Sequence, residues 1–334
     1  MNRFRALLYI IGIILIIRII FLLPFLESLE FKAQDSLFRY RGVQPISDNL
    51  AVIAIDDASF SALNETWPFP RAYHAKLIEN LFLAGARQVI FDIEFTESSG
   101  SQDDAILAMT AARYGNVIFA GKVLFPKREG EPIQMITPIA EITDQGLSWG
   151  IVNMPAESDG FIRNYSCYEI FDKTPIYSIG VASLANLRVY QNSWAEHLKP
   201  NQGKLQVYGK TIPLGHDGKV IVNYKGPAHT FPYFSYASIL DDSTFAMPGY
   251  QGVELDEFYE IQASEALKNK IVLVGASIDE LHDKFPTPFG GEWMPGVEIH
   301  ANFMEMVLSG NYVSKINPWM YLAIQFVLTA LLWF

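Results

Sequence analysis

An apolar segment near each end of the chain limits what the chain can fold into. Residues 6–26 are almost entirely apolar apart from Arg18, and their number matches the ~20 residues that cross a bilayer as a helix. Residues 318–334 form a second apolar run, which contains Trp319, a residue type enriched at membrane interfaces. The sequence therefore predicts two membrane helices with a separate domain between them, at residues 27–317.

Charged residues around the first apolar run predict its orientation. Arg3 and Arg5 precede the run, whereas Glu27 and Glu30 follow it directly. Because the cytoplasmic flanks of membrane helices are enriched in Lys and Arg, we expect the N-terminus in the cytoplasm. The main domain is then outside the inner (plasma) membrane, in the periplasm or the extracellular space. The run is longer than the roughly 7–15 residues of a signal-peptide core, so residues 1–26 are predicted to remain attached as a signal anchor.

The second apolar run stops at Phe334, slightly short of a full crossing, and no charged residue follows it. A natural protein seldom ends inside a membrane helix. We therefore expect this chain to be a truncated form of a longer protein, whose remaining part lies beyond residue 334.

Composition narrows the classes of function open to this chain. Its 334 residues, half of them hydrophobic, can hold one large domain or two of average size. The net charge is −11, whereas a nucleic-acid-binding surface needs clustered Lys and Arg, so no nucleic-acid partner is expected. The single cysteine, Cys167, excludes an intrachain disulfide and a cysteine-rich zinc site.

The region after the first run predicts a parallel β-sheet. Residues 50–55, L-A-V-I-A-I, form a continuous apolar run that is typical of a strand buried on both faces. A helical pattern starts at Pro70, and residues 88–93, Q-V-I-F-D-I, form the next strand. A strand, a helix and a strand within about forty residues predict a parallel pair of strands joined by a right-handed crossover.

Later segments extend the predicted sheet and interrupt it. Residues 116–121 and 270–275 repeat the buried-strand pattern, and residues 295–310 have the apolar spacing of a helix. Residues 204–227 contain short strands separated by glycine turns, which is typical of a β-meander. We therefore predict an α/β domain with a mostly parallel sheet, flanking helices and a β-rich insertion, held between transmembrane helices.

Seven short motifs occur in series between the two apolar runs. In chain order they are A-I-D-D-A-S-F, W-P-F-P-R-A-Y-H-A, A-G-A-R-Q-V-I-F-D-I-E-F, D-G-F-I-R, K-I-V-L-V-G-A-S-I-D, D-K-F-P-T-P and P-G-V-E-I-H-A-N. Together they resemble the CHASE domain of the second type (CHASE type 2), the cyclase/histidine-kinase-associated sensory extracellular domain. Each motif alone is weakly specific, but the series is specific, and the resemblance spans residues 31–312.

The resemblance implies a bacterial sensory input domain rather than an enzyme. Such domains sit N-terminal to membrane helices and a cytoplasmic output. The output is a class III adenylate or guanylate cyclase, a histidine kinase, a Ser/Thr kinase or a cyclic-dinucleotide enzyme. The family's ligands are largely undefined, so no catalytic residue is carried over. We expect a membrane-bound homodimer that responds to an unknown extracytoplasmic ligand and regulates an output of this kind.

Acidic residues lie at the ends of the first two predicted strands. Because the carboxyl ends of parallel strands meet at one edge, this topology places Asp56, Asp57, Asp92 and Glu94 close together. Two interpretations of this cluster are open. In one, the carboxylates bind a ligand or a divalent metal, Ca²⁺ or Mg²⁺, with Asp56, Asp57 and Asp92 as the metal candidates. In the other, one carboxylate caps a helix while another pairs with Arg71. No other cofactor is expected.

Polar residues near the end of the domain form a second group. Three of them, Ser277, Asp283 and His300, follow the chain order of an α/β-hydrolase triad. The motif fails at Asp279, where G-x-S-x-G requires glycine. A Zn²⁺ site and purely structural hydrogen bonds are the other interpretations, and the residues with suitable nitrogen and oxygen atoms are His282, Asp283, Glu298 and His300.

Two hypotheses for the function follow from the sequence. The favoured one is the sensory domain, and the rival is an exported metal-dependent hydrolase that uses Asp56, Asp57 and Asp92. In either case Trp67 packs against the arginine ion pair or stacks on a ligand. The residues of the predicted ligand-binding or structural cluster are Asp56, Asp57, Trp67, Arg71, Asp92, Glu94, Asp283 and His300.

Overall fold

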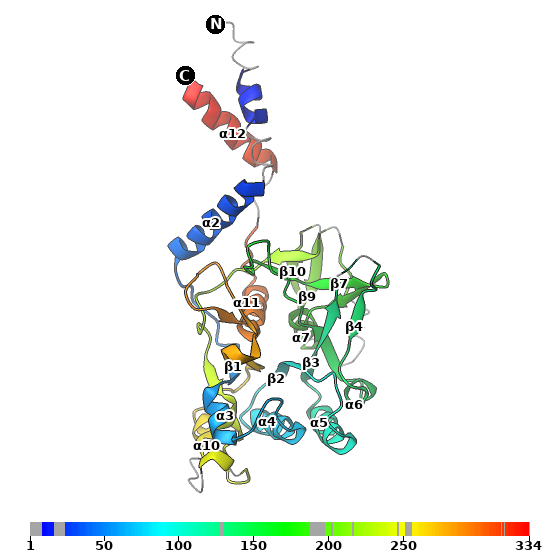
Figure 1. Ribbon diagram of the computed structural model, residues 1–334. Coiled ribbons are helices and arrows are strands. Elements are labelled where there is room, and N and C mark those ends of the chain that lie inside the picture. Colours follow the sequence, from blue (N-terminus) through cyan, green and yellow to red (C-terminus); the bar gives the residue numbers. More distant parts are fainter. Residues whose placement is uncertain are drawn as a thin grey trace. The chain divides into compact units, whose positions relative to one another are not determined.

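The chain divides into two compact units. Figure 1 shows the computed structural model, which describes residues 9–16, 24–126, 128, 130–187, 198–201, 203–215, 217–245, 247–250, 256–314, 316 and 318–333. One unit combines residues 1–42 with residues 313–334, and the other unit is residues 43–312.

Helices form most of the described part of the terminal unit. Residues 9–16 are helical, α2 spans Pro24–Arg41 and α12 spans Pro318–Trp333. Among the described residues, no helix is both long enough and apolar enough to cross a membrane. Much of the predicted signal anchor, residues 1–8 and 17–23, lies outside the described residues. The two membrane helices therefore stay predictions.

A sheet that has seven strands in the described residues forms the centre of the other unit. Its strands are β1 (Leu50–Ile55), β2 (Gln88–Glu94), β3 (Val117–Leu124), β4 (Gln134–Ile136), β5 (Ser148–Ile151), β12 (Tyr233–Ser235) and β13 (Ile271–Ala276). They lie in the order β12-β1-β13-β2-β3, and β3 also pairs with β5 in parallel and with β4 in antiparallel orientation. The other described pairs of this sheet are parallel, so the prediction of a mostly parallel sheet is confirmed.

β13 lies between β1 and β2, which were predicted to be a pair. Leu50 pairs with Ile271, and Ile271 in turn pairs with Gln88. The predicted direct pairing of β1 with β2 is therefore wrong. The sequence pattern did predict that β13 is a buried strand, but a local pattern does not reveal which distant strands it pairs with. Since neighbouring strands lie about 4.8 Å apart, the ends of β1 and β2 are separated by roughly 10 Å.

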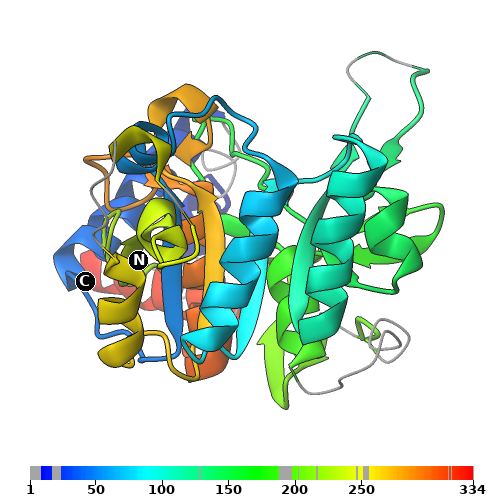
Figure 2. The same cartoon turned by 90° about the horizontal axis from the view of Figure 1, so that it is seen from below.

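Helices cover both faces of the sheet. On one face, α4 (Arg71–Leu83) and α5 (Ser101–Tyr114) lie side by side, as Figure 2 shows, and α9 (Tyr236–Leu240) packs against α4. On the other face lie α7 (Ile179–Asn186) and α11 (Gly296–Ser309).

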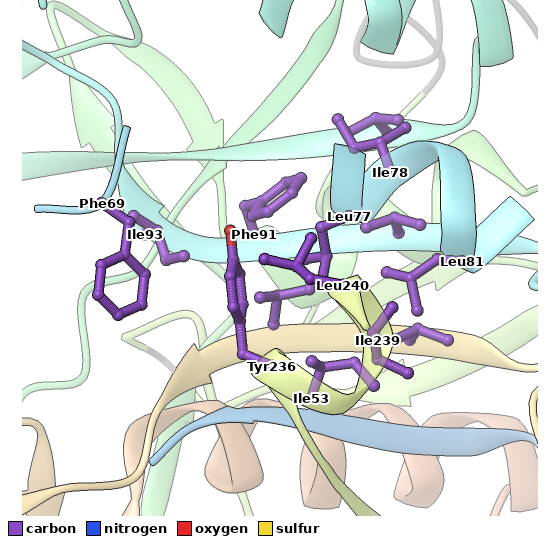
Figure 3. Packing of buried hydrophobic residues seen from close by; sticks show 14 of the residues in the cluster. Ile53, Phe69, Leu77, Ile78, Leu81, Phe91, Ile93, Tyr236, Ile239 and Leu240 are labelled. Carbon is purple, nitrogen blue, oxygen red and sulfur yellow. The ribbon is translucent and has the colours of Figure 1, made fainter. Parts of the chain in front are cut away.

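Strand residues alternate between these two faces, and one set builds the main hydrophobic core. Ile53, Val274 and Phe91 are paired in register across β1, β13 and β2. They pack with Leu77 of α4 and Tyr236 of α9 (Figure 3). This core fixes the three central strands, and with them the positions of the loops that follow.

The next position along each of these strands faces α11. Ala54, Gly275 and Asp92 are paired in register there. A Cβ atom on Gly275 would come within 2.7 Å of Val297 on α11, so this close approach requires glycine. The approach brings the end of β2, and Asp92 with it, beside the first turns of that helix.

Short antiparallel pairs occupy the middle and the end of the domain. They are β6 (Asn164–Ser166) with β11 (Lys219–Ile221), β7 (Tyr168–Phe171) with β8 (Thr174–Tyr177), β9 (Lys204–Val207) with β10 (Lys210–Pro213), and β14 (Lys284–Phe285) with β15 (Met294–Pro295). The remaining helical elements are short and lie between the longer helices and the strands. They are α3 (Asp57–Leu63), α6 (Ala140–Asp144), η1 (Pro248–Tyr250), α10 (Glu257–Ala263) and η2 (Asp279–Leu281).

Candidate ligand-binding site

A cavity of about 680 Å³ lies at the carboxyl edge of the sheet. It is lined by the ends of β2 and β13, by the segment that leads into α4, and by loops that follow β2, β5 and β13. Open α/β sheets bind ligands at this edge, because the loops after the strands converge there. The polar and aromatic lining includes Trp67, Arg71, Asp92, Glu94, Thr96, Lys122 and Asp283.

Asp56, at the end of β1, caps a helix. It is the N-cap of α3 and accepts hydrogen bonds from Ser59 N at 2.9 Å and from Ser59 Oγ at 2.5 Å. The hydroxyl of Ser235, at the end of β12, donates to the same carboxylate at 2.8 Å. Asp57 is the first residue of α3 and is exposed. Asp56 thus has the capping role, and neither residue is part of the cavity lining.

Arg71, in the first turn of α4, pairs with an acid outside the predicted cluster. Its Nε lies 3.1 Å from Oδ1 of Asp104, and both side chains are buried. Its Nη2 donates to the backbone carbonyl of Glu97 at 2.8 Å, and its guanidinium lies 4.7 Å from the centre of the Phe95 ring. The predicted pairing of Arg71 with an acid at a strand end is therefore wrong. The N-terminal turns of α4 and α5 are in contact here, so Arg71 of α4 pairs with Asp104 of α5.

Trp67 lines the cavity and also packs against protein rings. Its ring lies edge-on to Phe69 at 5.4 Å and to His74 at 6.3 Å between centroids. His74 is buried, its Nδ1 lies 2.9 Å from the hydroxyl of Tyr236, and burial lowers its pKa to about 3. Trp67 itself is half-buried, so a part of its ring remains accessible from the cavity.

Asp92, at the end of β2, sits where its charge is disfavoured. Its side chain is only 7% exposed, and its Oδ1 lies 3.8 Å from Nε2 of His300, which is too long for a hydrogen bond. Its Oδ2 has no hydrogen-bond partner among the described residues. Burial raises the pKa of Asp92 well above its usual value, and the neighbouring charges of Asp283 and Glu94 raise it further.

His300, on α11, is held next to Asp92 by a tyrosine. Its Nδ1 lies 2.7 Å from the hydroxyl of Tyr165, whose oxygen accepts a hydrogen bond from Gly180 N at 3.3 Å. This contact fixes the ring of His300, and Nε2 is the ring nitrogen nearest Asp92. Burial lowers the pKa of His300 to about 3, so the ring is neutral and does not balance a charge on Asp92.

Glu94 and Asp283 are two further acids of the lining, and they differ in their partners. Oε2 of Glu94 lies 2.5 Å from Nζ of Lys122 on β3, so a cation balances its charge. Across the described part of the chain, no basic side chain forms an ion pair with Asp283. Burial raises the pKa of Asp283 to about 7, with a further contribution from the charge of Glu94.

The second predicted group is not gathered into a triad or a metal site. The hydroxyl of Ser277 donates to a backbone carbonyl of β1 at 3.3 Å. The Glu298 carboxylate accepts hydrogen bonds from His229 N (2.7 Å), Thr230 N (2.8 Å) and the Tyr233 hydroxyl (2.8 Å). Within the described residues, no three His, Cys, Asp or Glu side chains are grouped to hold a metal ion. This geometry gives no support to the triad, the zinc site or the hydrolase based on Asp56, Asp57 and Asp92.

Sequence reasoning missed two charged residues of this region, Asp104 and Lys122. Asp104 balances the charge of Arg71, and Lys122 balances that of Glu94; Arg71 and Glu94 were both predicted site residues. Lys122 does carry a signal, because it interrupts the apolar run V-I-F-A-G-K-V-L of β3. Asp104 carries less, since acids in the first turn of a helix are common.

Comparison with protein families gives the class of this protein. The family model of the CHASE2 domain matches residues 11–334. The chain therefore belongs to the CHASE2 family, whose domains are sensory and not catalytic, and the resemblance drawn from its seven motifs is confirmed. Comparisons with curated proteins and with solved structures find no match.

Proposed function

We propose that residues 43–312 are the extracytoplasmic input domain of a bacterial membrane receptor and bind a small ligand in the cavity at the sheet edge. Membership of the CHASE2 family supports a sensory role. The observation that carries the proposal is the cavity, because its volume of about 680 Å³ lies within the ~300–1,000 Å³ typical of small-molecule sites. Its position at the carboxyl ends of parallel strands is also where open α/β sheets bind ligands.

α11 is the element through which a ligand in this cavity acts. The first residue of α11, Gly296, donates its backbone N–H to the carbonyl of Asp283 at 2.9 Å. In the second turn of α11, Nε2 of His300 lies 3.8 Å from Oδ1 of Asp92. A ligand that binds Asp92 and Asp283 therefore contacts two residues that adjoin α11. The chain then runs from the end of α11 into the terminal unit. The ligand shifts the arrangement of α11 only as far as its affinity differs between the two arrangements.

The output of this receptor is cytoplasmic. A class III adenylate or guanylate cyclase, or else a histidine or Ser/Thr kinase, receives the signal through membrane helices, and two copies of the receptor act together. The apolar runs at residues 6–26 and 318–334, with basic residues before the first, support this topology.

A substitution that fills the cavity tests the proposal. Thr96 is half-buried in the cavity lining, so Thr96→Trp puts a large ring into the space a ligand occupies. In cells that carry the complete receptor, we expect the cyclic-nucleotide or phosphotransfer output of Thr96→Trp to become constant across growth conditions that change the unmodified receptor's output. The matched control is Thr174→Trp, at an exposed position on β8 outside the cavity. An output of Thr96→Trp that still follows growth conditions as the control does would contradict the proposal.

A further inference from the structure

Apart from the exposed Glu97, two carboxyl groups of the cavity have no cation among the described residues to balance them. Nearby basic side chains are already used, since Lys122 pairs with Glu94, Arg71 with Asp104 and Lys284 with Asp279. After these pairs are assigned, Asp92 and Asp283 remain, and no Lys or Arg of the described residues pairs with either. His300 faces Asp92 but is neutral, as its lowered pKa of about 3 requires.

One of these groups has an unused hydrogen-bonding atom. The side chain of Asp92 is 93% buried and lines the cavity, yet its Oδ2 has no partner in the described part of the structure. An unpaired buried acceptor destabilises the folded state, so native proteins rarely keep one without a reason. By contrast, the buried carboxylate of Glu298 on α11 receives three hydrogen bonds.

The size and lining of the cavity favour an organic molecule over a bare metal ion. No three metal-ligating side chains of the described residues are grouped there, whereas a cavity of about 680 Å³ has room for a small organic molecule. Trp67 adds an aromatic surface beside the acids, and such surfaces attract organic cations. An ammonium group offers three donors and a guanidinium five, which suits a site that contains two carboxylates, one of them with an unpartnered oxygen.

We propose that the cavity binds a small organic cation, an ammonium or guanidinium compound, whose charged group is held between Asp92 and Asp283. This inference rests on the proposed ligand-binding role of the cavity and adds the chemical class of the ligand. The cation supplies a positive charge to both acids, and a turn of the Asp92 carboxyl group lets it donate to Oδ2, which is shielded in the ligand-free domain. It also joins the end of β2 to the loop after β13, the two segments that contact α11.

Binding of such a cation depends on pH. Asp283, with a pKa of about 7, is ionised at pH 8 and largely protonated at pH 6. The titratable and charged groups that face this pair are Glu94 of β2, Lys122 of β3, His282 of the same loop and His300 of α11. Glu94 and Lys122 are paired, and His300 is neutral at both pH values, so the pH dependence is measured in a His282→Gln background, which leaves Asp92 and Asp283 as the titrating pair. Protons and the cation thus compete for the same two carboxyl groups.

Isothermal titration of the purified 334-residue chain tests the inference. The probes are agmatine and butylamine, which stay positively charged at pH 6 and pH 8 because amines titrate near pH 10. The uncharged isostere of butylamine is 1-butanol, and CaCl₂ is the metal probe. We expect saturable binding of at least one amine at pH 8, weakened roughly tenfold at pH 6, which is the loss expected for one charge-assisted hydrogen bond.

Substitutions then assign the binding to the two acids. Asp92→Asn and Asp283→Asn are each expected to weaken amine binding roughly tenfold, whereas Asp57→Asn, at an exposed acid outside the cavity, leaves it unchanged. Circular dichroism checks that each variant is folded, and two independent positions guard against one that fails to fold. No saturable binding of either amine, equal binding of 1-butanol, binding of Ca²⁺ alone, or binding unaffected by both Asn variants overturns the inference. If Thr96→Trp still silences the receptor's response in that case, the cavity remains a ligand site and only the class of ligand is wrong.

Discussion

Asp56 and Asp92 both lie near the carboxyl end of a strand of the same sheet, yet their surroundings are opposite. Asp56 accepts hydrogen bonds from Ser59 and Ser235 and caps α3. Asp92 has one oxygen with no partner, a neutral histidine 3.8 Å from the other, and a second unpaired acid nearby. The strand β13 lies between the two residues and keeps them apart.

The difference teaches which acids at a sheet edge are structural. A carboxylate whose acceptors are filled by the protein stabilises the fold, and its removal costs free energy of unfolding. A carboxylate that is buried without donors lowers the stability of the ligand-free domain, so its removal costs little. Such a group persists at functional sites, where stability is given up for binding. Substitutions in the two kinds of acid should therefore shift stability in different directions.

The largest effect is expected at Glu298, a buried acid whose carboxylate accepts three hydrogen bonds. Glu298→Ala leaves two backbone N–H groups and the Tyr233 hydroxyl without their acceptor. Each unsatisfied donor costs about 1–3 kcal/mol, so we expect a loss of about 3 kcal/mol or more in the free energy of unfolding by urea. Glu298→Gln keeps one acceptor oxygen and should lose clearly less. Equal losses for the two variants would show that volume, and not hydrogen bonding, explains the role of Glu298.

A smaller loss is expected at Asp56. Asp56→Ala removes the N-cap of α3 and should lower the free energy of unfolding by about 1–2 kcal/mol. Asp57→Ala changes the adjacent exposed acid and should stay within about 0.5 kcal/mol of the unmodified chain. Urea unfolding followed by tryptophan fluorescence measures both. If Asp57→Ala costs as much as Asp56→Ala, capping by Asp56 is not the source of the effect.

The smallest effect, and one of opposite sign, is expected at Asp283. The pKa of this residue is about 7 in the folded chain and near 3.8 in the unfolded chain, so the folded state binds its proton more tightly. Stability from this group is present below about pH 4 and is lost as the pH rises through 7. Asp283→Asn cannot ionise, so it should be more stable than the unmodified chain at pH 8, on the order of 1 kcal/mol.

The pH dependence of that difference is the check on Asp283. Urea unfolding at pH 4 and pH 8 should give a stabilisation by Asp283→Asn that grows between the two values. Lys284, the next residue, pairs with Asp279 and serves as a neighbouring control through Lys284→Gln. A stabilisation of Asp283→Asn that is the same at both pH values would mean that Asp283 does not titrate near pH 7.

Local patterns in the sequence were enough to predict the central elements of the fold. The apolar runs at residues 50–55, 88–93 and 270–275 are strands of a mostly parallel sheet, and the helix that begins near Pro70 is α4. The apolar pattern within each of these segments is enough to predict that the segment is buried. The order of the strands could not be predicted in this way, because β1 pairs with a strand more than two hundred residues later.

The same limit applies to the candidate site. Trp67, Arg71, Asp92, Glu94 and Asp283 were all singled out from the sequence, and the structure places all five around one cavity. Their partners were not predicted, since an ion pair such as that of Arg71 with Asp104 depends on how two helices pack. For the same reason, sequence alone did not separate the bonded acid at the end of β1 from the unbonded one at the end of β2.

A direct comparison of Asp92→Ala with Asp56→Ala tests the central claim, that the cavity acids are kept for a ligand and not for the fold. Both variants remove a carboxylate from the end of a strand of the same sheet, and urea unfolding at pH 8 without added amine measures each. We predict that Asp56→Ala loses about 1–2 kcal/mol while Asp92→Ala loses nothing or gains stability. A loss for Asp92→Ala equal to or larger than that for Asp56→Ala would contradict the account.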